Sequence, residues 1–116
     1  MDIIRIHGYI HDIITAIEAI QNFIEGHTIR SMSNDDKTLS AIIRKFEIMG
    51  EAAKRVPPEF CLNHPDIPWS SMAKLRDKLI HHYADIDLII LWETTKDILP
   101  TLHQSLCTII QNRENS

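Results

Sequence analysis

Apolar residues recur at helical spacing near the start of the chain. They fall at positions 3, 6, 10, 13, 14, 17, 20 and 24, which a period of 3.6 residues places on one face. This pattern predicts a helix over residues 3–25. Gly26 suits its end, because glycine tolerates the left-handed backbone that follows many helices. The polar stretch HTIRSMSNDD is expected to connect to the next helix, with Ser33 or Asn34 as the N-terminal cap.

The same period returns in residues 35–56 and predicts a second long helix. The prolines at 57 and 58 end it, because proline lacks the backbone donor that a helix interior needs. The segment PPEFCLNHPDIPW holds four of the five prolines and is expected to be a loop with one short helical turn. In the second helix, the apolar positions expected to face the core are Leu39, Ile42, Ile43, Phe46, Met49, Ala53 and Val56.

Two more helices are predicted after this loop. The third begins at residues 68–70, and its apolar stripe comprises Met72, Leu75, Leu79 and Tyr83. The fourth covers residues 88–111, with Asp87 as its cap and a kink at Pro100. Because no segment alternates as a strand does, the chain is predicted to be all-α, a bundle of four main helices with one short additional turn.

Length and composition are those of a small globular protein, with 44% apolar and 24% charged residues. We expect a single domain over residues 1–116, with 112–116 as a disordered tail. The chain has no apolar run long enough to span a membrane, and MDIIRIHGYIHD does not resemble a secretory signal. A cytoplasmic location is therefore expected. Cys61 and Cys107 lack metal-ligand spacing and are expected to be free thiols.

The net charge of −4 is unevenly distributed. Residues 1–36 sum to −4, 57–71 to −2 and 84–116 to −3, whereas 37–56 sum to +3 and 72–83 to +2. An acidic total argues against a protein that coats nucleic acid along its whole surface. Two basic segments on an acidic chain instead favour local binding of a polyanion, because salt screens the more distant charges.

The stretch KLRDKLIHHY, residues 74–83, combines arginine, histidine and tyrosine within the third predicted helix. On a wheel that starts at Met72, Arg76 lies about 40° away and His81 about 180° away. The two side chains therefore diverge on an ideal helix. They can share one cleft if the helix ends or distorts near His81, or if a second copy of the chain brings its own pair alongside.

These residue types suit the cleavage of RNA without a metal ion. Arg76 offers a planar cationic fork for a phosphate, and His81 is a general acid or base. Asp77, four residues before His81, can orient a ring nitrogen. The alternative is structural, because arginines in apolar stripes are often ion-pair partners and histidines favour helix C-termini. From spacing alone, the structural interpretation is favoured by about two to one.

The sequence around this motif resembles a known family. RDKLIHHY fits the R-x4-H-x-Y motif of HepT-like proteins, the toxin half of HEPN/MNT toxin-antitoxin systems within the HEPN superfamily of helical ribonucleases. Three longer segments resemble the family in the same order and cover most of residues 1–103. They are AIIRKFEIMGEAAKRVPPEF, HPDIPWSSMAKLRDKLIHHY and DLIILWETTKDILP.

The resemblance implies a HEPN-type bundle and a metal-independent endoribonuclease toxin, of type VII-like systems, that cleaves transfer or messenger RNA. Arg76 and His81 match the ribonuclease pair, Asp77 the polar position after the arginine, and Tyr83 the tyrosine that a nucleotidyltransferase antitoxin modifies with AMP. Family members form homodimers whose two motifs line a shared cleft, and no cofactor is implied. The alternative is a catalytically inactive helical dimer that binds a nucleotidyltransferase partner or a nucleotide.

Other polar residues give weaker signals. His82 leaves open which histidine titrates, although the spacing favours His81. Gly50 within a helix suggests a close helix approach, which we expect at the dimer contact. His7 and His11 are spaced to bind a metal ion but lack a third ligand, so no metal site is expected. The side chains that we expect to contact substrate phosphates, with a solvated face as the alternative, are Lys74, Lys78, His82, Arg44 and Lys45, and also Lys54 and Arg55.

Overall fold

The structure, a computed structural model, describes residues 1–114, and all its regular elements are helical. The longer helices are those predicted, except that a π-helical segment interrupts the fourth. In chain order the elements are α1 (Ile3–Phe23), α2 (Ile29–Asn34), α3 (Asp36–Arg55), α4 (Pro58–Asn63), α5 (Trp69–His81), a 3-10 turn (Tyr83–Asp85), α6 (Leu88–Glu93), the π-helical segment (Thr94–Ile98) and α7 (Leu99–Glu114). The all-α prediction is confirmed.

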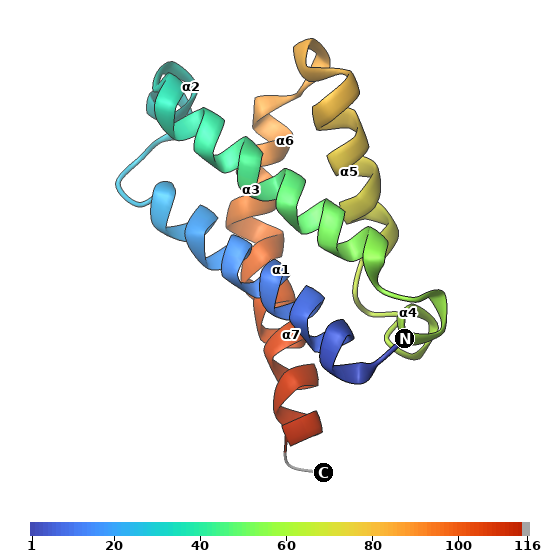
Figure 1. The fold of residues 1–116 in the computed structure, drawn as a ribbon. Helices are drawn as coiled ribbons and strands as arrows, with labels where there is room; N and C mark the ends of the chain where they lie inside the picture. The colour runs from blue at the N-terminus through green and yellow to red at the C-terminus, as the bar shows by residue number, and fades with distance from the viewer. Residues whose placement is uncertain (115–116) are drawn as a thin grey trace.

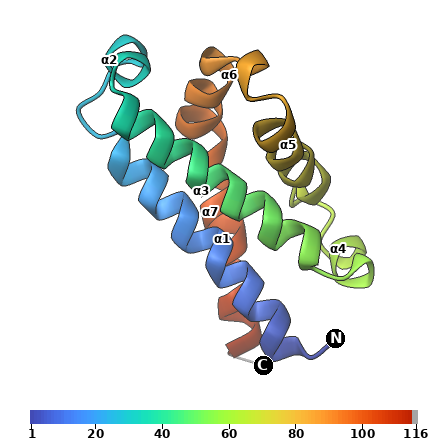
Figure 2. The ribbon, with the colours of Figure 1, turned by 45° about the horizontal axis from the view of Figure 1, so that its top comes forward.

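Helix α3 is at the centre of the bundle. It packs against α1 on one side and α5 on the other, and α7 packs against α1. Figure 1 and Figure 2 show α1 and α3 side by side, with the column formed by α6 and α7 crossing behind them. The core is rich in isoleucine because α1 buries one apolar stripe: Ile6, Ile10, Ile13, Ile14, Ile17 and Ile20. The packing of α5 against α3 fixes the helix that carries the candidate motif.

The polar stretch after α1 contains a short helix that the sequence pattern did not predict. Helix α2 has six residues and buries only Met32, too few positions to produce a helical period. Thr28 caps it by accepting a hydrogen bond from the Ser31 amide. The cap of α3 is Asp35, which accepts from the Thr38 amide at 3.1 Å, so the prediction of Ser33 or Asn34 was wrong.

The last helical column departs from regular α-helix just before Pro100. The five residues Thr94–Ile98 are π-helical, and the Leu99 amide donates to the Thr94 carbonyl. Because Pro100 has no amide hydrogen, the break in regular hydrogen bonding expected there occurs in the preceding turn. Asp87 caps the column as predicted, accepting from the Ile89 amide at 2.9 Å.

The C-terminal end of the chain differs from the prediction. Helix α7 continues to Glu114, so residues 112–114 of the predicted tail are helical. Residues 115 and 116, which complete that predicted tail, lie outside the described residues. Within the described chain, no helix is both long and apolar enough to cross a membrane.

Candidate functional site

Helix α5 is anchored at its first turns and ends at the predicted histidine. Trp69 is buried and its indole Nε1 donates to the His64 carbonyl at 3.0 Å. The helix ends at His81, and His82 follows in a non-helical conformation. Tyr83 therefore does not belong to the apolar stripe as predicted. It begins the 3-10 turn and is 55% exposed, because the helical wheel no longer applies beyond the helix end.

The close helix approach predicted from Gly50 lies between α3 and α5 of one chain. A Cβ atom at Gly50 would collide with the Arg76 Cβ and lie 2.5 Å from the Met72 carbonyl oxygen. Gly50 is itself buried, so the expectation that it marks a dimer contact is replaced by an internal crossing. Glycine is required here because only the absence of a Cβ lets the two backbones approach. The crossing fixes the base of the Arg76 side chain.

The Arg76 guanidinium lies between two carboxylates from different helices. Its Nη2 is 3.0 Å from Glu51 Oε2 on α3, and its Nη1 is 3.1 Å from Asp77 Oδ1 on α5. Glu51 also pairs with Arg55 at 3.2 Å, and Asp77 pairs with Lys54 at 3.1 Å. Arg76 is only 24% exposed, and its Nε is buried without a hydrogen-bond partner within the described chain. We call these five side chains the α3–α5 charge network.

Asp77 has the role of an arginine partner. The hydrogen bond from Arg76, and then that from Lys54, lower the pKa of the Asp77 carboxyl below its usual range. The structure places Asp77 against Arg76 and not against the His81 ring, which the helical spacing allowed it to orient. His81 makes no side-chain hydrogen bond in the described part of the chain.

Arg76 lines a groove that does not include His81. The groove has a volume of about 310 Å³ and lies between α1, α3 and α5. Neither His81 nor Tyr83 is among its lining residues, as expected from the divergence of the motif on the helical wheel. Its lining residues are Tyr9, Asp12, Arg44, Glu47, Ile48, Glu51, Ala52, Arg55, Arg76 and Ile80. Within one chain, the predicted cation and the predicted acid or base therefore face different spaces.

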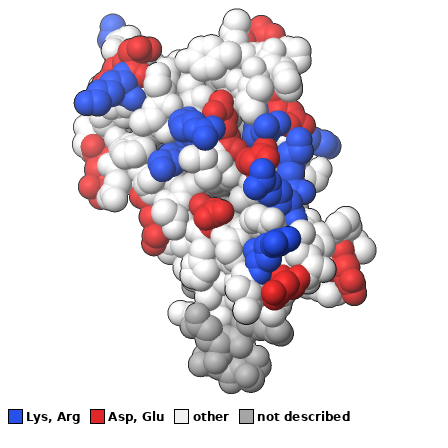
Figure 3. Space-filling view, in the orientation of Figure 1, with Lys and Arg blue, Asp and Glu red and all other residues white. Residues whose placement is uncertain are grey.

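The predicted phosphate-binding side chains lie on the surfaces of α3 and α5. Figure 3 shows Lys and Arg gathered over these helices, interleaved with acidic side chains. Lys74, Lys78 and His82 are exposed, whereas Lys45 is partly buried. Arg44 is exposed and pairs with Glu47 at 3.3 Å. The basic surface is therefore local and partly neutralised.

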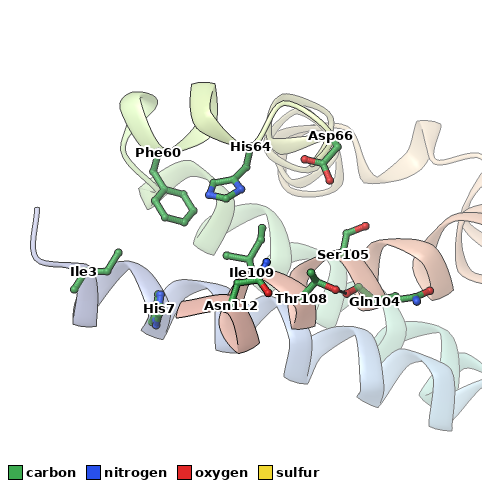
Figure 4. Close-up of a pocket in the computed structure, with 10 residues that line it drawn as sticks. All are labelled: Ile3, His7, Phe60, His64, Asp66, Gln104, Ser105, Thr108, Ile109 and Asn112. Carbon is green, nitrogen blue, oxygen red and sulfur yellow. Dashed lines mark hydrogen bonds between the residues drawn. The ribbon is translucent and has the colours of Figure 1, made fainter. Parts of the chain in front are cut away.

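A larger hollow lies elsewhere on the molecule and contains none of the predicted site residues. It measures about 590 Å³ and lies between the start of α1, α4 and α7. Figure 4 shows Phe60 and His64 reaching toward it from one side and Thr108 and Asn112 from another. Its surroundings include segment 57–71, which carries a net −2. This hollow is consequently a poor candidate for binding RNA.

No group of three or more His, Cys, Asp or Glu side chains suited to a metal ion occurs among the described residues. His11 is exposed on α1, and His7 is partly buried at the edge of the hollow between α1, α4 and α7. Cys61 and Cys107 are free thiols. Burial raises the pKa of the Cys61 thiol.

Glu51 is the site residue that the sequence did not identify. It follows Gly50 directly, and its carboxylate reaches across to Arg76 on the neighbouring helix. A glycine within an amphipathic helix marks a close crossing, so its neighbours are candidates to face the partner helix. That signal was present in the sequence, but only the structure shows which helix is the partner.

Comparison with known proteins places this arrangement in a family. The family described as "Ribonuclease HepT-like" matches residues 13–109, most of the chain. The chain belongs to the HepT-like ribonuclease family. Its all-helical bundle agrees with the HEPN-type fold expected from the R-x4-H-x-Y motif.

Individual HepT-like relatives match over most of their length. "Probable ribonuclease HepT" of Thermococcus cleftensis is 46% identical over 94 residues, which are 81% of this chain and 86% of that protein. A "Putative RNase" of Methanocaldococcus jannaschii is 36% identical over 109 residues, 94% of this chain and 90% of that protein. Another protein of that name, from Caldanaerobacter subterraneus, is 33% identical over 106 residues, 91% and 95% of the two chains. No solved structure matches the chain significantly.

Proposed function

We propose that this protein is a metal-independent endoribonuclease, acting in the cytoplasm as the toxin of a type VII-like HEPN/MNT toxin-antitoxin system. The observation that carries the proposal is the fixed, partly exposed guanidinium of Arg76 on the helix that ends at His81. The names of the family and of its relatives support ribonuclease activity. Transfer RNA and messenger RNA are the substrates proposed.

The proposed reaction is an internal transesterification of RNA. A ribose 2′-oxygen forms a bond to the adjacent phosphorus, and the bond from phosphorus to the 5′-oxygen breaks. His81 accepts the 2′-hydroxyl proton as a base, and the imidazolium that forms then donates it to the departing 5′-oxygen. Arg76 binds the non-bridging oxygens, whose negative charge increases in the transition state. The products are a 2′,3′-cyclic phosphate and a 5′-hydroxyl.

A homodimer would bring the two groups into one cleft. Arg76 and His81 face different spaces within a single chain. In a symmetric pair, Arg76 of one copy can face His81 of the other. The exposure of His81, Tyr83 and the neighbouring Ile80 leaves this end of α5 accessible to a second copy.

Tyr83 is the proposed site of regulation by a nucleotidyltransferase antitoxin. Its side chain is exposed in the turn directly after the histidines, so a modifying enzyme can reach its hydroxyl. Transfer of AMP from ATP would form a bond from the Tyr83 oxygen to the α-phosphorus and release pyrophosphate. The added anion would compete with substrate phosphate near His81. Intact mass should rise by AMP units after incubation with the antitoxin and ATP, and Tyr83→Phe should abolish the rise.

Cleavage of RNA by the purified protein in EDTA tests the activity. Wild type should produce fragments with 2′,3′-cyclic phosphate ends, and His81→Ala should lower the rate on the order of 10²- to 10⁴-fold. His82→Ala is the matched control, since it removes the adjacent exposed imidazole, and should retain most activity. Equal cleavage by wild type and His81→Ala would reject the assignment, and loss with His82→Ala alone would move the acid-base role to His82.

A catalytically inactive helical dimer that binds a nucleotidyltransferase or a nucleotide is the second candidate. One observation favours it: Arg76 already has two carboxylate partners, as a purely structural arginine would. This candidate predicts AMP transfer to Tyr83 without any RNA cleavage by wild type. The cleavage assay and the mass measurement together distinguish the two.

A further inference from the structure

Glu51 stands apart from the other acidic residues of the groove that Arg76 lines. It is the only member of the groove, among the described residues, whose carboxylate pairs with Arg76 from a different helix. Its Oε2 contacts Arg76 and its Oε1 contacts Arg55, so both oxygens are engaged. Glu47, one turn earlier on α3, pairs only with the exposed Arg44.

The α3–α5 charge network itself carries a net positive charge, and the groove beside it also contains Asp12, Glu47 and Arg44. The three cations of the network share two carboxylates, which gives a formal total of +1. Each carboxylate is divided between two cations, so neither neutralises Arg76 alone. The network can therefore hold the guanidinium in one orientation and still attract a phosphate.

Glu51 and Asp77 together restrain the guanidinium plane. They bind two different terminal nitrogens, at 3.0 and 3.1 Å. The crossing at Gly50 fixes the Cβ end of the same side chain. Asp77 is the sequence neighbour of Arg76 and moves with α5, whereas Glu51 ties the guanidinium to α3. Loss of Glu51 would free the arginine to swing about the remaining contact.

We propose that Glu51 is a positioning residue for the reaction, holding Arg76 in the orientation that receives the substrate phosphate. This role rests on the proposed ribonuclease function. Glu51 does not touch the substrate and transfers no proton. Some N–H groups of Arg76 do not bind a carboxylate, and Glu51 keeps these pointing at one place. Their direction matters because a small displacement of a catalytic group lowers the reaction rate.

The orientation of Arg76 can be measured without any activity. The buried Nε–H of Arg76 should give an NMR cross-peak that exchanges slowly with water, assigned by its loss in Arg76→Lys. In Glu51→Ala this peak should exchange faster and show greater mobility. Glu51→Gln, which preserves size and a hydrogen-bond acceptor, should give an intermediate result. Glu47→Ala, the matched control on the same helix, should leave the peak unchanged.

Cleavage kinetics then test the consequence of that orientation. Glu51→Ala should lower kcat/KM roughly 10- to 100-fold, mainly through kcat, and Glu47→Ala should not. In an Arg76→Lys background, Glu51→Ala should cause no comparable further loss, because its effect acts through the guanidinium. A full additional loss there would overturn the proposal.

Failure of the proposed function can be distinguished from failure of the positioning role of Glu51. If wild type does not cleave RNA, the proposed function fails, and the cross-peak still decides whether Glu51 holds Arg76. An Arg76 peak that is equally protected in wild type and Glu51→Ala overturns the positioning role. The positioning role is also overturned if the Arg76 peak exchanges faster in Glu51→Ala while the cleavage rate is unchanged.

Discussion

Helix α5 has a packed end and an exposed end. The packed end extends from Trp69 to Leu79, with Trp69, Met72 and Leu79 buried and Arg76 tied to α3. Every residue from Ile80 to Asp85 is exposed. One short helix thus joins a fixed cation to an accessible pair of histidines and a tyrosine.

This difference is compatible with the roles that the proposed reaction gives to the two ends. A cation that stabilises a transition state gains from being held in advance, because reorientation during the reaction would raise the barrier. An acid-base group and a modification site must instead be reachable by substrate or partner. In the proposed reaction, the substrate or a second copy of the chain would complete a cleft at the exposed end of α5.

Alanine substitution at each end should separate activity from stability. Arg76→Ala and His81→Ala should each lower cleavage by at least 10²-fold, since each removes one of the two reacting groups. Arg76→Ala should also cost on the order of 1 kcal/mol of unfolding free energy, because it removes a largely buried side chain that packs at the Gly50 crossing and one cation from a partly exposed network. His81→Ala should change stability by less than about 0.5 kcal/mol, because the side chain is exposed. Thermal unfolding of both variants beside the cleavage assay measures the contrast, and equal losses of stability would contradict it.

The packed end can be broken at the helix crossing. Gly50→Ala should destabilise the protein by about 1–3 kcal/mol, because the added methyl group meets the Arg76 Cβ and the Met72 carbonyl. Gly8→Ala is the control, since no atom lies within 4 Å of a Cβ added there. It should be neutral or stabilising by up to about 1 kcal/mol, because alanine favours helix. Urea unfolding of both variants tests the pair, and equal midpoints would refute a tight crossing.

Acid should weaken the packed end through Asp77. Its pKa is lowered in the folded protein, chiefly by the hydrogen bond from Arg76, so the charged form stabilises the fold. That contribution is complete above the unfolded pKa of about 3.9 and is lost as pH falls through the lower folded pKa. The difference in Tm between wild type and Asp77→Asn should therefore stay constant from neutral pH down to about 5 and shrink below about 4. A difference that grows in acid would have the wrong sign.

The sequence predicted the long helices well and the segments that connect them poorly. Regular apolar spacing was enough for α1, α3 and α5, because each buries a continuous stripe. Helix α2 has one buried residue, and Asp35 rather than Ser33 or Asn34 caps α3. Short-range hydrogen bonds determine both features, and apolar periodicity does not report such bonds.

The candidate site was predicted in part. The motif identified Arg76, Asp77, His81 and Tyr83, but their partners depend on tertiary contacts. Asp77 pairs with Arg76 and Lys54, and Glu51 approaches only because the glycine before it allows the helices to touch. Tyr83 was placed in the apolar stripe because the wheel was extended past the true helix end.

Mixing two inactive variants tests most directly whether a second copy completes the site. Arg76→Ala and His81→Ala chains, carrying different tags, would be refolded together and assayed on RNA. If Arg76 of one copy acts with His81 of the other, half of the randomly mixed dimers keep one intact pair, and activity should recover to about a quarter of wild type. The same mixture remaining as inactive as either variant alone, beside active refolded wild type, would contradict the account.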